Sequence, residues 1–88
     1  MSAIVVHGRV IGPNGEPISG ASVMFARGPV AVPDIAQITT SQGTFALAAP
    51  IEGNYCILVN APGFPVMEHD VEVVRGKASA IDIAVRER

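Results

Sequence analysis

The sequence is poor in charged residues, and this limits the partners it can recognise. Asp, Glu, Lys and Arg make up 16% of the 88 residues, well below the roughly 25% of an average soluble domain. Nucleic-acid binding depends on clustered Lys and Arg that displace counterions. Six such residues and a net charge of -2 therefore predict no nucleic-acid partner. No apolar run approaches the roughly 18 residues of a membrane span, so none is predicted.

Cysteine is almost absent, and this excludes a disulfide within the domain. The single Cys56 lies in an apolar stretch, where we expect a packed thiol rather than a reactive one. A chain of this length forms one domain, 1–88, with a thin core. Its stability must therefore come from packing.

Residues that carry catalysis or bind metals are also scarce. His7 and His69 are the two histidines, and they do not form a ligand set at metal-binding spacing. Glu68-His69-Asp70 resembles an acid, base and orienting group, but successive strand residues point to opposite faces. The sequence has no nucleophile elbow, phosphate loop or dinucleotide motif. We therefore predict no catalytic residue, no metal and no cofactor.

The apolar residues that are present follow a strand pattern. Short runs rich in Val, Ile, Thr and Phe alternate with Gly, Pro and Asn, and no stretch has helical periodicity. The pattern predicts an all-β, seven-stranded sandwich. The predicted strands cover residues 3–11, 21–26, 35–40, 44–48, 54–61, 66–74 and 78–85.

Turn residues set the connections between these strands. Residues 12–17 form a dense turn of Gly, Pro and Asn, and residues 41–43 predict a hairpin between the third and fourth strands. Residues 27–34 contain Pro29 and Pro33, which cannot donate to a β-ladder. We expect this segment to be the longest loop or a broken edge strand.

Alternation assigns the side chains of each strand to a face. The inward set is predicted to be Ile4, Val6, Gly8, Val10, Ala21, Val23, Phe25, Phe45, Leu47, Tyr55, Ile57, Val59, Val71, Val73, Ile81, Ile83 and Val85. The outward set is mostly polar and includes Thr39. Its apolar exceptions are Val5, Met24, Cys56 and Leu58.

Five short motifs in order resemble the carboxypeptidase regulatory-like domain. They are Gly8-Arg9-Val10, the run from Gly15 to Val23, the run from Thr40 to Phe45, Gly53-Asn54-Tyr55, and Ala61-Pro62-Gly63-Phe64. The resemblance covers nearly the whole chain. It implies a prealbumin-like (transthyretin-like, immunoglobulin-like) Greek-key sandwich that serves larger proteins as a folding, spacing or docking module without activity.

The resemblance also gives roles to individual residues. Gly15 and Gly43 are expected at positive φ, and Tyr55 is expected to tie down a neighbouring loop through its hydroxyl. Phe64 is expected to plug the end of the sandwich, and the alternative is an exposed anchor for a carbohydrate or a peptide. Gln42 replaces an Asp that family members often carry, which weakens the case for calcium. The transthyretin-related hydrolase of 5-hydroxyisourate, which shares this fold, uses a His in the first strand. This sequence has Arg9, directly before Val10, where that family has the His, so hydrolysis is only a remote alternative function.

Function is therefore expected on the surface. Met24 and Leu58, together with Pro29, Val30, Val32 and Pro33 of the long loop, form the predicted patch for a protein partner or for self-association. The alternative is that the loop only protects a sheet edge. Similar modules occur on bacterial injection machines, which is an analogy of fold. A carbohydrate-binding module is a second class, with weak support from one Tyr, three Phe and no Trp.

The N-terminal segment has no basic region followed by a long apolar core, so it reads as a strand and not as a signal peptide. As written, the sequence predicts a cytoplasmic protein. Export by a leaderless route, or a place within a larger chain, stays open.

Overall fold

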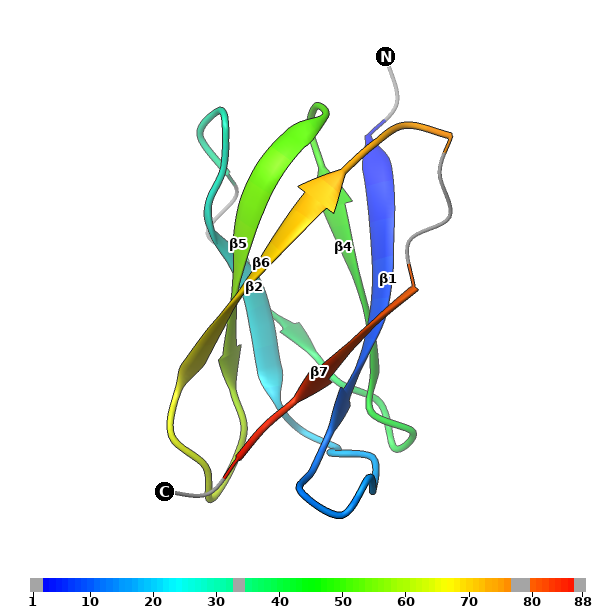
Figure 1. Ribbon diagram of the computed structural model, residues 1–88, viewed down its shortest axis with the longest axis vertical. Helices are drawn as coiled ribbons and strands as arrows, with labels where there is room; N and C mark the ends of the chain where they lie inside the picture. Colours follow the sequence, from blue (N-terminus) through cyan, green and yellow to red (C-terminus); the bar gives the residue numbers. More distant parts are fainter. Residues whose placement is uncertain (1–2, 33–34, 77–79, 87–88) are drawn as a thin grey trace.

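The chain folds into two packed β-sheets. The computed structural model describes residues 3–32, 35–76 and 80–86, and these contain seven strands and no helix, hence no helix that could cross a membrane (Figure 1). The strands are β1 (Ile4–Ile11), β2 (Ser22–Arg27), β3 (Gln37–Ile38), β4 (Thr44–Ala49), β5 (Gly53–Asn60), β6 (Met67–Val73) and β7 (Ala80–Ala84). The predicted all-β sandwich is confirmed.

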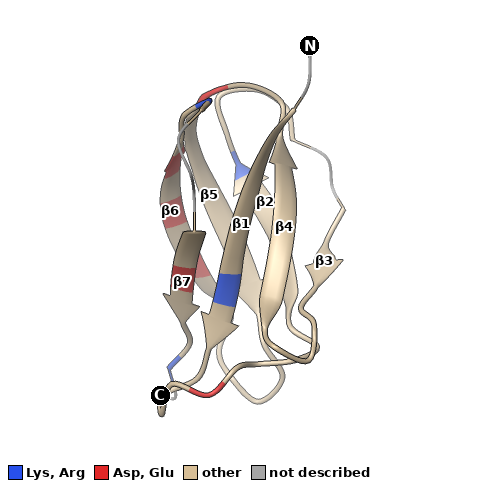
Figure 2. Ribbon diagram, turned by 90° about the vertical axis from the view of Figure 1, so that its right-hand side faces the viewer, with Lys and Arg blue, Asp and Glu red and all other residues tan. Residues whose placement is uncertain are grey.

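The strands divide into a three-stranded and a four-stranded sheet. The first has the order β4-β1-β7 and the second the order β3-β2-β5-β6. β1 pairs antiparallel with β4 and parallel with β7, while every pair in the four-stranded sheet is antiparallel. Figure 2 shows the sheets as two layers, with β6 and β7 at edges of different sheets.

The core lies between the sheets and follows the alternation of the sequence. Each predicted inward residue is buried, except for Gly8, Val71 and Ile81, which are half-buried. Ala49 and Ala61 complete the cluster. The tilted rings of Phe25 and Tyr55 lie 4.6 Å apart between centroids, within the range of favourable aromatic pairs.

The predicted hairpin at residues 41–43 is wrong. β3 is only two residues long and pairs with β2, whereas β4 pairs with β1 in the other sheet. The turn itself is tight, because the Gly43 N–H donates to the Thr40 carbonyl at 2.8 Å and Gly43 has a φ of 76°. It therefore carries the chain from one sheet to the other.

Thr39 corrects a second prediction, since it is buried and not outward. Its hydroxyl donates to the Ile18 carbonyl at 2.7 Å and accepts the Ala21 N–H at 2.9 Å. The alternation predicted from a strand over 35–40 fails here because the strand ends at Ile38. Thr39 instead joins the segment after β3 to the entry of β2.

Both ends of the sandwich are closed as the resemblance implies. The Tyr55 hydroxyl donates to the Ile51 carbonyl at 2.8 Å and so fixes the turn between β4 and β5. Phe64, in the β5–β6 connection, is half-buried against the core, which confirms it as a plug. Gly15 has a φ of 82° in the turn after β1, where a side chain would be strained.

Candidate partner-binding surfaces

Met24 and Leu58 lie side by side on the outer face of the four-stranded sheet. They are partners in the β2–β5 register, and both are half-buried. Residues that oppose each other in a register share a face. Ile38 opposes Ser22 in the β2–β3 register, so it lies on the same face, where its side chain is 62% exposed. We call Ile38, Met24 and Leu58 the apolar strip.

The long loop occupies a different position from the strip. Pro29 packs on Gly53, where an added Cβ would lie 2.7 Å from the proline Cγ, and a Cβ added to Gly28 would lie 2.6 Å from carbons of the Tyr55 ring. Val32 packs against the core, while Val30 is 42% exposed. The described part of the loop thus closes one end of the sandwich, and Pro33 lies outside the described residues.

A shallow hollow separates the loop from the strip. It has a volume of about 450 Å³, and its lining includes Arg27, Asn54, Cys56, Asp70 and Glu72. A register shift in β2 brings Arg27 opposite Cys56. The predicted patch is therefore two surfaces, the strip on the sheet and Val30 at the end, with the hollow between them.

Arg27 and Cys56 set the electrostatics of the hollow. The Arg27 guanidinium pairs with the Glu68 carboxylate at 3.3 Å, and this hydrogen bond raises the pKa of Arg27. Burial raises the pKa of the Cys56 thiol, because the charged form would lose its hydration. The packed thiol is confirmed, since Cys56 lies on the outward face as predicted but is only 3% exposed between its register neighbours Arg27 and Asp70.

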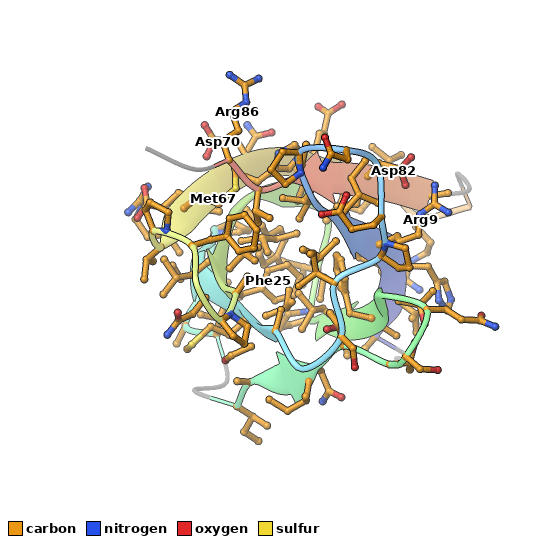
Figure 3. The ribbon with its side chains drawn as sticks, turned by 90° about the horizontal axis from the view of Figure 1, so that it is seen from below. Arg9, Phe25, Met67, Asp70, Asp82 and Arg86 are labelled. Carbon is orange, nitrogen blue, oxygen red and sulfur yellow. The ribbon has the colours of Figure 1, made fainter. Side chains whose placement is uncertain are left out.

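The side chains with catalytic potential are dispersed over the fold. His7 is exposed on the outer face of the three-stranded sheet, and His69 is half-buried on the core side of β6, away from Glu68 and Asp70. Arg9 pairs with Asp82 at 3.3 Å, and the two lie together in Figure 3. Within the described residues, no group of His, Cys, Asp or Glu could hold a metal ion.

The turn in which Gln42 replaces the family's Asp is closed by Thr40. The Thr40 hydroxyl oxygen accepts the N–H groups of Gln42 and Thr44, at 3.3 and 3.2 Å. Sequence reasoning missed both Thr39 and Thr40. A hydroxyl residue at the start of a Gly-containing turn is a signal for such a local bond, and it was available for Thr40.

Comparison with models of protein families identifies the family of this chain. The model of the carboxypeptidase regulatory-like domain matches residues 5–86. The chain belongs to this family. Domains of this family occur as modules in larger proteins. The comparison with curated proteins found no match.

The solved structures that share the fold of this carboxypeptidase regulatory-like domain include two bacterial proteins. One is the TIE protein of Bacillus anthracis, with a TM-score of 0.70 and 16% identity over 98% of this chain, which spans 17% of that protein. The other is the dioxygenase domain of a dioxygenase carbohydrate-binding protein fusion from the cellulolytic bacterium Streptomyces sp. SirexAA-E. It has a TM-score of 0.72 and 16% identity over 99% of this chain and 81% of that chain.

Proposed function

We propose that this domain is a non-catalytic docking module of a larger assembly, and that it binds a protein partner through the apolar strip. The observation that carries the proposal is the pairing of Met24 with Leu58, beside the exposed Ile38, on a sheet face that no described element covers. Large side chains on a flat face give a partner apolar area to bury. Met24 adds a flexible side chain that adapts to a contacting surface.

The polar residues support docking over catalysis. Cys56 is buried with its neutral form favoured, which opposes a role as a nucleophile. Arg9 and Arg27 are each engaged by a carboxylate. His7 and His69 belong to different sheets, so they do not converge on one reacting group.

The aromatic residues favour a protein partner over a carbohydrate. Sugar sites present exposed aromatic platforms, but Phe25, Phe45 and Tyr55 are buried and Phe64 packs against the core. These four are all the aromatic residues of the chain apart from histidine. The apolar strip is aliphatic, and such a surface gains from burial against another apolar surface rather than against hydroxyl groups.

The experiment compares two matched double variants. Met24→Asp with Leu58→Asp places two charges on the strip, and Val5→Asp with Ala48→Asp places two on a register pair of the opposite sheet face. Proteins that cross-link to the wild-type domain in its native cells are identified and purified. Their binding to the wild type and to each double variant is then measured by titration. We expect the dissociation constant to rise at least about tenfold for the strip variant and to change little for the control.

Light scattering tests the second copy of the chain as the partner. A wild-type dimer that the strip variant dissolves into folded monomers supports the strip as a self-association surface. Ile38→Asp is the alternative variant if the double variant fails to fold, because Ile38 is 62% exposed on a short edge strand. A partner that binds the strip variant as tightly as the wild type overturns the proposal.

A further inference from the structure

Among the strands of the described residues, β6 has the longest regular free edge. β6 ends the four-stranded sheet, and its seven residues pair with β5 without a bulge or register shift. No other described segment makes backbone hydrogen bonds to it. Alternate N–H and C=O groups along the edge therefore face outward, and such an edge is a template for another strand.

One side of this edge is acidic. Glu68, Asp70 and Glu72 alternate along β6, are exposed, and share the outer face of the sheet; Figure 2 shows these acidic positions along the strand. Arg27 neutralises Glu68. Asp70 and Glu72 have no ion pair within the described residues, so the edge keeps negative charge for a neighbouring strand to complement.

The other side of the edge is incompletely covered. Met67, His69 and Val71 point toward the core but are half-buried, whereas the corresponding residues of β5 are fully buried. In Figure 3 Met67 lies on the core side of β6, and Asp70 projects away from the molecule. A strand added here would complete the cover of this row with apolar side chains of its own.

A second copy of β6 fits this edge badly. An antiparallel pair centred on Asp70 would place the two Asp70 carboxylates opposite each other and Glu68 opposite Glu72. Like charges opposite each other destabilise a strand pair. The same acidic side chains of β6 attract a strand that carries cations at the opposing alternate positions. Charge therefore selects a strand from a different protein rather than a second copy of β6.

We propose that the β6 edge binds an extended protein segment in which Lys or Arg alternates with apolar residues, and that this segment adds a fifth strand to the sheet. Backbone hydrogen bonds to β6 supply the register. The cations lie beside Asp70 and Glu72, and the apolar residues lie beside Met67 and Val71. This inference does not rest on the apolar strip, because the strip lies on a sheet face and β6 is an edge.

The test uses a blocked heptapeptide that alternates lysine with valine, added to the whole domain and followed by amide NMR. We expect shifts and slowed exchange concentrated in Met67–Val73, with affinity that falls as salt rises. Asp70→Asn with Glu72→Gln should weaken binding about 3- to 20-fold. Glu16→Gln with Asp82→Asn removes the same charge elsewhere and should change the affinity less than about twofold.

Two further peptides distinguish strand addition from simple charge attraction. A peptide N-methylated at alternate residues keeps the charge but loses the backbone donors, and we expect no binding. A glutamate-valine peptide should bind only to the variant Asp70→Lys with Glu72→Lys. The proposal is overturned if the methylated peptide binds as well as the parent, if both neutralising variants weaken binding equally, or if the lysine peptide does not bind. Concentration-dependent shifts of β6 amides without peptide would also overturn it, because its own copy would then occupy the edge.

Discussion

Replacing Thr39 by Val removes one buried hydroxyl and changes the volume of the side chain little. The hydroxyl donates to the Ile18 carbonyl at 2.7 Å and accepts the Ala21 N–H at 2.9 Å. Thr39 is 4% exposed and Ala21 is fully buried. The variant thus leaves a backbone N–H without a partner and without access to water, which is the costly way to lose a hydrogen bond.

The expected loss follows from these contacts. Two net hydrogen bonds contribute about 1 kcal/mol each, and the stranded N–H adds about 1 to 3 kcal/mol of desolvation. The extra buried methyl group returns about 1 kcal/mol. We expect the free energy of unfolding to fall by about 2 to 4 kcal/mol, which for a domain of this size lowers the midpoint of thermal unfolding by about 8 to 32 °C.

Thr39→Ser is the control, because it keeps the hydroxyl and removes only a methyl group, at a cost of about 1 kcal/mol. Urea unfolding followed by circular dichroism should rank the stabilities as wild type, then Ser, then Val. If apolar burial at this site were the dominant effect, Val would equal or exceed the wild type and Ser would be the least stable. That order would refute the hydrogen-bond reasoning.

Three further predictions concern the core and the ends of the sandwich. Gly8→Ala should lower the free energy of unfolding in urea by about 1 to 3 kcal/mol, because the new Cβ would lie 2.7 Å from a Phe45 ring carbon and 2.8 Å from Ile81. Adding Phe45→Leu to Gly8→Ala should recover part of this loss. If the losses of the two single variants simply add in the double variant, the prediction is contradicted. Tyr55→Phe should lower the free energy of unfolding by about 1 kcal/mol, because it removes the hydrogen bond to the Ile51 carbonyl. Equal thermal midpoints for the variant and the wild type would contradict this prediction. The raised pKa of Cys56 means that its neutral thiol stabilises the fold fully below the unfolded-state pKa, and that this contribution is lost as pH rises from about 8.5 through the higher folded pKa. Wild type should therefore lose more stability than Cys56→Ala between pH 8 and about 10.5, and parallel losses would exclude the thiol as the cause.

The sequence motifs were sufficient for the family and most of the core. Alternation predicted the buried faces of β1, β2, β4, β5 and β7 because each strand has one face on the core, and a period of two is then enforced by the cost of burying polar groups. The motif order predicted the positive φ of Gly15 and Gly43 and the hydroxyl bond of Tyr55, since these depend on neighbours close in sequence. The resemblance also predicted the packing of Phe64 against the core.

Only the tertiary structure decided which strands pair and which outward residues are covered. The turn at residues 41–43 has the same local form in a hairpin and in a crossing between sheets, so the sequence did not reveal that β3 and β4 separate. Cys56 faces outward by alternation, but it is buried between its register partners Arg27 and Asp70, which come from strands distant in sequence. The free edge of β6 likewise exists because no later strand pairs with it. Local pattern determines the face of a residue, whereas its exposure depends on what long-range pairing places beside it.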